Sequence, residues 1–154
     1  MNDAPSILFV CLGNICRSPL AEGALRTAAR EAGLALEIGS AGTGDWHVGN
    51  PPDPRAIEVA REEGVDITTL RARQVAYEDF TRFTHIFALD ADNLRNLRQL
   101  APGDTTAELA LLLDMVPGRE GQAVADPYYG GAEGFEQTWA DVNAAAKALV
   151  ARFS

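Results

Sequence analysis

Residues 6–20 of the chain read SILFVCLGNICRSPL and divide into three parts. The first, 6–10, is an unbroken apolar run, which predicts a strand buried on both faces of a sheet. The last part opens a stretch whose apolar residues recur at helical spacing, and Pro19 suits the first helical position, so we expect a helix over 18–32. The segment between them, 11–17, is therefore predicted to lead from a buried strand to the N-terminus of a helix.

Apolar runs and amphipathic stretches alternate along the rest of the chain. We expect further strands over 34–38, 84–89 and 108–113, and further helices over 54–64, 91–101 and about 133–152. This alternation predicts an α/β fold: one domain over 1–154, with a central four-stranded parallel sheet and helices on both faces. Ligands bind such sheets beyond the carboxyl ends of the strands, which is where the loop after the first strand must lie.

Composition and charge narrow the class of protein. The chain has 154 residues, 47% of them hydrophobic, and a formal net charge of −9, so an anionic partner such as nucleic acid or a lipid surface is unfavourable. No apolar run approaches the ~20 residues of a membrane-spanning helix, and residues 1–5 lack the basic and apolar regions of a signal peptide. With only two cysteines, both in one short segment, the chain is expected to be cytoplasmic.

The loop after the first strand has the composition of an oxyanion site. It consists of Leu12, Gly13, Asn14, Ile15 and Cys16, followed by Arg17 and Ser18. Successive backbone N–H groups at a helix N-terminus attract negative charge, and Gly13 and Asn14 are the residues that best tolerate the left-handed backbone that such a nest requires. Arg17 adds a planar fork of donors that suits a tetrahedral oxyanion.

Cys11 lies at the end of the first strand, where it faces the centre of this nest. The helix terminus and Arg17 favour the thiolate form of its side chain, and the Ser18 hydroxyl can donate a hydrogen bond to the sulfur. A thiolate below a bound phosphate is positioned for in-line attack on phosphorus. The plain alternative for Cys11 is a buried small hydrophobic residue, and for Ser18 a helix N-cap.

The stretch Cys11–Pro19 resembles the phosphate-binding loop of the low-molecular-weight protein tyrosine phosphatases, which carry Cys-x5-Arg-Ser near the N-terminus. Later blocks of the chain extend the resemblance in the family's order: SAGTG from Ser40, Trp46, GNPPD from Gly49, ARQ from Ala72 and DPYY from Asp126. Cys-x5-Arg by itself is only moderately specific, whereas its combination with Asp-Pro-Tyr-Tyr more than a hundred residues later is highly specific.

The resemblance implies a two-step hydrolysis of phosphotyrosine without metal or cofactor. Cys11 attacks the phosphate, Arg17 and the loop hold the equatorial oxygens, and Asp126 protonates the leaving phenol and then activates water. Trp46, Tyr128 and Tyr129 would line the substrate cleft, while Asn14 and Ser40 would brace the loop. Many family members carry histidine in place of Leu70, where it anchors the loop asparagine, so the bracing of Asn14 must here be different or weaker.

Other readings of single residues stay open. Asp126 could only begin a turn, because Asp-Pro commonly opens one, and Trp46 and the two tyrosines could be packing residues. Cys16 could be a packed residue or a redox partner that traps an oxidised Cys11 as a disulfide. Asp90 follows a strand, where we expect it to cap the next helix.

Three other functions compete with the phosphotyrosine phosphatase. An arsenate reductase of this fold needs further cysteines, and none follows Cys16. Protein-arginine phosphatases tend to carry Thr in place of Ile15, and a catalytically silent phosphotyrosine-binding module usually lacks the nucleophile, the arginine or the acid. The expected partner is a phosphotyrosine protein, such as an autophosphorylated bacterial tyrosine kinase, and we expect a monomer or a weak dimer.

Overall fold

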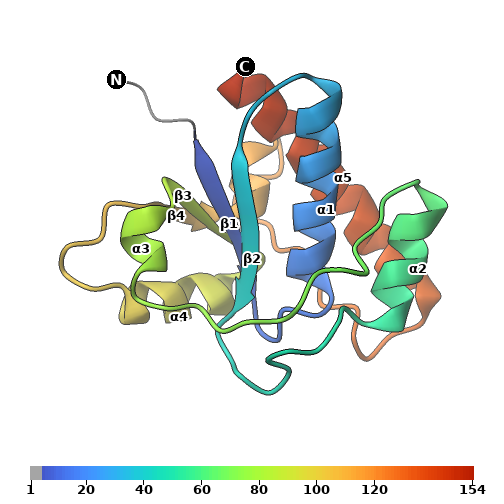
Figure 1. Ribbon diagram of the computed structural model, residues 1–154, viewed down its shortest axis with the longest axis horizontal. Helices are drawn as coiled ribbons and strands as arrows, with labels where there is room; N and C mark the ends of the chain where they lie inside the picture. The colour runs from blue at the N-terminus through green and yellow to red at the C-terminus, as the bar shows by residue number, and fades with distance from the viewer. Residues whose placement is uncertain (1–4) are drawn as a thin grey trace.

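The computed structural model describes residues 5–154 and contains one four-stranded parallel sheet (Figure 1). Its strands are β1 (Ser6–Cys11), β2 (Glu37–Gly42), β3 (His85–Ala88) and β4 (Glu108–Leu111), in the order β2-β1-β3-β4. The predicted four-stranded parallel sheet is thereby confirmed. Residues 1–4, part of the stretch examined for a signal peptide and of the expected 1–154 domain, lie outside the described residues.

Helices cover both faces of the sheet. They are α1 (Arg17–Glu31), α2 (Pro54–Glu62), α3 (Asp79–Arg82), α4 (Ala91–Leu100) and α5 (Ala132–Phe153), with a short 3₁₀ helix, η1 (Leu112–Met115). In Figure 1, α1 and α5 lie together on one side of the sheet, and α3 and α4 lie on the other. None of the helices in residues 5–154 is long and apolar enough to cross a membrane.

Strand β1 is buried on both faces, as its unbroken apolar run predicts. Ile7 and Phe9 belong to a core shared with α1 and α5, whereas Leu8 and Val10 belong to a second core shared with α3 and α4. Because side chains alternate across a strand, one central strand supplies both hydrophobic layers. The two layers fix β1 in the middle of the molecule, and with it the position at which Cys11 leaves the sheet.

The second strand differs from its prediction over 34–38. Gly33 ends the preceding helix with a φ of 67°, Leu34 donates back to Ala29, and pairing with β1 runs from Glu37 to Gly42. The glycines and serine of this strand are not typical strand residues, so the residue types alone did not indicate where the strand lies. The difference matters because Ser40 lies inside a strand next to β1 rather than in a loop.

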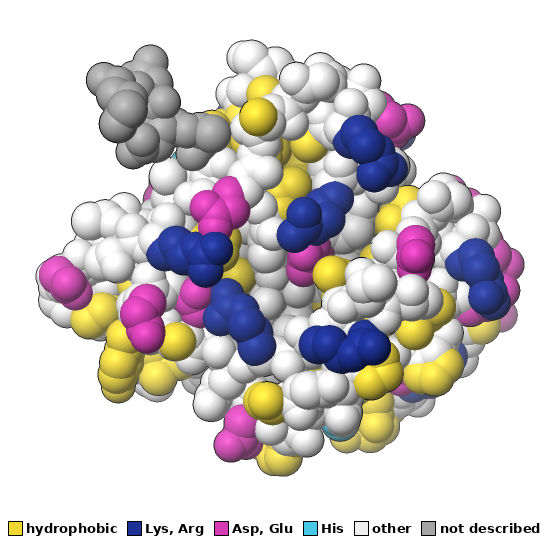
Figure 2. Space-filling model, viewed as in Figure 1, with side chains coloured by type: hydrophobic (Ala, Val, Ile, Leu, Met, Phe, Trp, Pro, Cys, Tyr) yellow, Lys and Arg dark blue, Asp and Glu magenta, His cyan; other side chains and the backbone are white. Residues whose placement is uncertain are grey.

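The remaining differences are smaller. The strand expected over 108–113 ends at Leu111, because the chain then turns into η1, and the single-turn helix α3 was not predicted. The view in Figure 2 shows several Lys or Arg side chains on the face that carries β2, in a chain of net charge −9. Ion pairs involving β2, α1 and α3 include Arg26 with Glu22, Arg73 with Asp79, and Arg82 with Glu37.

Candidate active site

The loop 12–16 joins the carboxyl end of β1 to the N-terminus of α1. Three carbonyl groups of the stretch 11–16 accept hydrogen bonds from neighbouring segments: that of Cys11 from the N–H of Thr43 and that of Leu12 from Gly44, both at 2.9 Å, and that of Ile15 from Asp53 at 2.8 Å. Within residues 5–154, the N–H groups of residues 13–16 have no acceptor. With the carbonyls turned outward, these N–H groups are free to bind an anion beside a helix N-terminus.

Two residues allow the chain to follow this path. Asn14 has a φ of 58°, the left-handed conformation that asparagine tolerates, whereas Gly13, for which the same was predicted, has no positive φ. Gly42 is the second, because a Cβ at this position would lie 2.8 Å from the carbonyl oxygen of Leu12. The loop therefore rests directly on the backbone of β2.

A chain of side-chain hydrogen bonds ends on the sulfur of Cys11. The side-chain oxygen of Asn14 accepts from the backbone N–H of Arg73 at 3.0 Å, so its amide nitrogen faces Ser18 and donates to the hydroxyl at 2.7 Å. The Ser18 oxygen lies 3.0 Å from Cys11 Sγ. A thiolate can only accept a hydrogen bond, so when Cys11 is ionised the Ser18 hydroxyl donates to the sulfur and stabilises its negative charge. The bracing that Leu70 cannot supply comes from the backbone of Arg73.

Arg17 is the positive charge at the floor of the site, and only 3% of its surface is exposed. Its Nη1 donates to Asp90 at 2.7 Å and to the carbonyl of Val124 at 3.0 Å, and its Nη2 lies 3.6 Å from Asp126. Burial alone would lower the pKa of Arg17, but the neighbouring Cys11, Asp90 and Asp126 raise it above its usual value. The guanidinium therefore stays charged and fixed in orientation.

Asp126 begins a turn and also lies beside Arg17. One carboxylate oxygen accepts the N–H of Tyr128 at 3.0 Å, which makes it the first residue of a turn. The other faces Arg17, and the side chain is 41% exposed at the rim of the site. A half-exposed carboxyl group beside the anion site can exchange protons with both substrate and water.

The site opens into a cavity of about 440 Å³. Cys11 and Arg17 line it together with the loop, and its walls are Trp46, His47, Asp126, Tyr128 and Tyr129. The two tyrosine rings meet edge to face with centroids 5.0 Å apart, and Trp46 and Tyr129 are 69% and 93% exposed. Exposed aromatic side chains around an anion site suit a flat, apolar substrate group.

Comparison with known proteins agrees with this geometry. The sequence model of the family described as low molecular weight phosphotyrosine protein phosphatase matches residues 6–154. The chain belongs to this family. The low molecular weight phosphotyrosine protein phosphatase of Schizosaccharomyces pombe is 46% identical to it over 132 residues, which cover 84% of each protein.

Solved structures share the whole fold of this phosphatase. The crystal structure of YfkJ from Bacillus subtilis superposes with a TM-score of 0.90, and its sequence is 40% identical to this chain. The match covers 98% of this chain and 95% of YfkJ. A Drosophila arginine phosphatase is 29% identical with a TM-score of 0.91, and the match covers 96% of this chain and 97% of that one. Overall similarity of backbone therefore does not by itself separate phosphotyrosine from phosphoarginine.

The predicted bracing of the phosphate-binding loop by Ser40 is wrong. The Ser40 hydroxyl donates to the buried carboxylate of Glu22 at 2.7 Å, and the same carboxylate accepts from Arg26 at 2.8 Å. Ser40 therefore ties β2 to α1. The reason is the strand register, which turns its side chain toward this helix rather than toward the loop.

Cys16, the second cysteine of the phosphatase, is buried at the N-cap of α1. Burial, followed by the nearby charges of Asp53, Cys11 and Asp126, raises the pKa of its thiol to about 12. Cys16 is therefore a neutral thiol near pH 7, and its environment opposes a thiolate there. This favours the packing role for Cys16 in the resting protein.

No metal site stands out in the described part of the phosphatase. Among residues 5–154, no three His, Cys, Asp or Glu side chains are grouped so that they could hold an ion.

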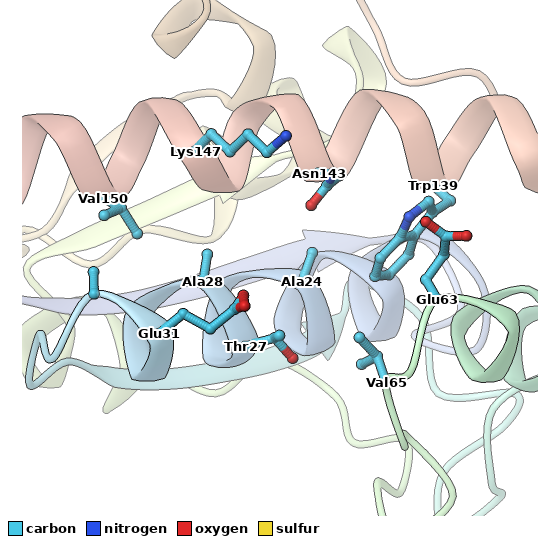
Figure 3. A pocket seen from close by; sticks show the side chains of 11 residues that line it. Ala24, Thr27, Ala28, Glu31, Glu63, Val65, Trp139, Asn143, Lys147 and Val150 are labelled. Atoms are coloured by element: carbon cyan, nitrogen blue, oxygen red, sulfur yellow. The ribbon is translucent and has the colours of Figure 1, made fainter.

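A further cavity of about 520 Å³ lies between α1 and α5 (Figure 3). There Ala24 and Ala28 of α1 face Asn143 and Lys147 of α5, and no residue of the phosphate-binding loop lines it.

Sequence reasoning missed several parts of the site. Asp90 caps α4 through its bond to the N–H of Asn93 at 2.8 Å, as expected, but its other oxygen also holds Arg17. His47 lines the cavity, and its ring lies beside Gly13. The Arg73 backbone and Gly42 shape the loop. Gly42 and Arg73 each lie in a sequence block of the family resemblance, the blocks that begin at Ser40 and at Ala72, but neither block indicated a contact with the loop.

Proposed function

We propose that this protein hydrolyses phosphotyrosine in protein substrates through a cysteinyl-phosphate intermediate. The observation that carries the proposal is the convergence of three groups on one cavity: the sulfur of Cys11, the guanidinium of Arg17 and the carboxyl of Asp126. Membership in the family and the protein-tyrosine-phosphatase names of its relatives support the same reaction.

In the first step, the thiolate of Cys11 attacks phosphorus and forms the S–P bond while the bond to the phenolic oxygen breaks. The free N–H groups of residues 13–16 and Arg17 bind the equatorial oxygens, whose charge they stabilise in the transition state. Asp126 gives its proton to the departing oxygen, which leaves as a neutral phenol. General acid catalysis of this kind contributes roughly 10²–10⁴-fold.

In the second step, water attacks the phosphorus of the intermediate. Asp126, now a carboxylate, accepts the proton of this water, and the S–P bond breaks to release orthophosphate and the thiolate. The hydroxyl of Ser18 donates to the sulfur, so it stabilises the thiolate both as the nucleophile and as the second leaving group. Arg17 and the loop N–H groups supply the positive charge for both steps, and we propose that no metal takes part.

The lining of the cavity supports an aryl phosphate as the substrate. Trp46 and the tyrosines offer ring faces to a phenyl group, and Ile15 adds an aliphatic surface at the floor. Protein-arginine phosphatases of this fold tend to carry a hydroxyl residue at the position of Ile15, and this isoleucine favours the phenyl ester. The chain has only the two cysteines, which disfavours the disulfide relay of an arsenate reductase.

One experiment tests the reaction and the substrate together. Wild type and Cys11→Ser are incubated with a phosphotyrosine peptide, a phosphoarginine peptide and arsenate plus a thiol reductant. We expect release of orthophosphate from phosphotyrosine by the wild type alone. Predominant turnover of phosphoarginine or arsenate rejects the substrate, and equal turnover by Cys11→Ser rejects the mechanism.

We also propose a cytoplasmic location, because the mechanism needs Cys11 reduced and both cysteines are free thiols. The proposed partner is a phosphotyrosine protein, such as an autophosphorylated tyrosine kinase in a bacterium. The proposed monomer or weak dimer is checked by sedimentation at several protein concentrations.

A further inference from the structure

The segment 126–131, called the acid segment here, carries the general acid Asp126. Its internal hydrogen bonds are two: the N–H of Tyr128 to Asp126, and the N–H of Gly130 to the carbonyl of Pro127, both at 3.0 Å. Within residues 5–154, α5 reaches the end of the acid segment through the N–H of Gly134, which donates to the carbonyl of Gly131 at 3.1 Å, and Arg17 lies 3.6 Å from the Asp126 carboxylate. The side-chain hydrogen bonds to the segment from another element come from Arg55, near the start of α2. A segment with so few anchors depends strongly on each of them.

Arg55 contacts the acid segment through hydrogen bonds to its carbonyl groups and through a cation–π contact with a tyrosine ring. Its Nη1 donates to the carbonyl of Gly130 at 3.2 Å and its Nη2 to the carbonyl of Tyr128 at 3.0 Å. The guanidinium carbon also lies 5.6 Å from the ring centre of Tyr128 and 4.6 Å from that of Phe135, in α5. Two carbonyls and two aromatic rings thus fix one planar group.

Asp53 connects Arg55 to the phosphate-binding loop. Its carboxylate accepts from Nε and Nη2 of Arg55, both at 3.0 Å, which sets the plane of the guanidinium. The backbone N–H of Asp53 donates to the carbonyl of Ile15 at 2.8 Å. A continuous path of hydrogen bonds therefore runs from the loop that binds phosphate to the segment that carries the acid.

We propose that Arg55 is a positioning residue, which with Asp53 holds Asp126 at the distance from the phosphate-binding loop that proton transfer to the leaving group requires. Arg55 does not line the cavity, so it acts through the acid segment rather than on the substrate. A general acid works only within hydrogen-bond reach of the oxygen that it protonates. The inference rests on the proposed function, because it assigns a position to the acid of that reaction.

The test compares two leaving groups. Arg55→Met removes the donors and the charge but keeps a long apolar side chain. We expect kcat/KM to fall about tenfold for phenyl phosphate, whose leaving group needs a proton, and less than about twofold for p-nitrophenyl phosphate. The matched control is Arg61→Met, because Arg61 is exposed on the same helix and its side chain forms an ion pair with the neighbouring Glu58. Equal losses for both esters, or none for either, overturn the proposal.

A double-mutant cycle separates this proposal from the proposed function. If Arg55 acts through Asp126, Arg55→Met adds no loss for phenyl phosphate in an Asp126→Ala background. An independent loss in that background rejects the positioning role while the phosphatase mechanism stands. If instead wild type fails to hydrolyse either ester, the proposed function itself fails.

A measurement without substrate gives a second readout. We expect the amide of Tyr128 to exchange its hydrogen at least about tenfold faster in Arg55→Met than in wild type, because the acid segment loses the two hydrogen bonds from Arg55 to its carbonyl groups. Exchange in β1 should not change, and unchanged exchange at Tyr128 contradicts the inference even if activity falls.

Discussion

The amide nitrogen of Asn14 lies 2.7 Å from the hydroxyl oxygen of Ser18, which itself lies 3.0 Å from the sulfur of Cys11. The amide oxygen of Asn14 accepts from the N–H of Arg73, so its amide nitrogen donates to Ser18 and leaves the hydroxyl proton of Ser18 free. When Cys11 is a thiolate, which can only accept, this proton is donated to the sulfur. In the proposed mechanism, the loop asparagine therefore acts through Ser18 and does not contact the reacting atoms.

This relay gives the first prediction. Ser18→Ala should lower kcat about tenfold or more, because the thiolate loses a donor when it leaves in the second step. Asn14→Gly keeps the left-handed backbone and removes the amide, so it should lower kcat in the same direction. Rapid-quench kinetics should show more cysteinyl-phosphate at steady state in both variants. Additive losses in the double variant would mean that Asn14 does not act through Ser18.

The second prediction concerns the acid. Asp126→Ala should lower kcat/KM for phenyl phosphate by roughly 10²-fold or more. The decrease for p-nitrophenyl phosphate should be far smaller, because nitrophenolate leaves without a proton. A series of aryl phosphates of graded leaving-group pKa measures the slope. Asp114→Ala is the control, since its carboxylate binds the N–H of Gly121 away from the cavity. An unchanged slope removes Asp126 from this role.

The third prediction separates the two functions of Asp90. Asp90→Asn retains a good helix cap for α4 but gives up the charge that holds Arg17, so we expect about tenfold weaker inhibition by orthophosphate. Asp90→Ala should in addition cost about 1 kcal/mol of stability from the lost cap, measured by urea unfolding. Asp92→Asn, an exposed change in the same helix, should affect neither quantity.

The fourth prediction follows from the raised pKa of Cys16. A thiol whose pKa is about 12 stays protonated at pH 8, so in folded Cys11→Ser iodoacetamide should leave Cys16 essentially unmodified, as mass spectrometry can show. Reactivity should rise only as the pH approaches the pKa of the thiol. Unfolding in urea removes the burial and should restore ordinary alkylation at pH 8. Rapid reaction in the folded protein would contradict the raised pKa.

The fifth prediction concerns the contact between β2 and the loop. Gly42→Ala places a methyl group against the carbonyl oxygen of Leu12, so the loop must shift. We expect orthophosphate to bind about tenfold more weakly, because the N–H groups of residues 13–16 no longer point to the same position. Gly103→Ala, at a position with open space, is the control. Unaltered phosphate inhibition would show that the loop tolerates the displacement.

The local sequence predicted those parts of the fold that depend on strong periodicity. The apolar run of β1 and the helical spacing after Pro19 were sufficient for the first βα unit, and Asp53 before Pro54 marked the start of α2. Strand β2 was misplaced because its glycines and serine carry no strand signal, and its pairing with β1 decides its position.

The sequence by itself determined which groups of the loop meet at the proposed site: Cys11, Arg17 and Ser18 lie within eight residues, so any backbone that closes this loop brings them together. Tertiary structure alone decided which groups hold them in place. Asp90, Arg73 and Arg55 come from distant elements, and their partners depend on strand order and register, which no local spacing encodes. Hydrogen bonds act over about 3 Å, so such contacts exist only once the sheet has brought these elements together.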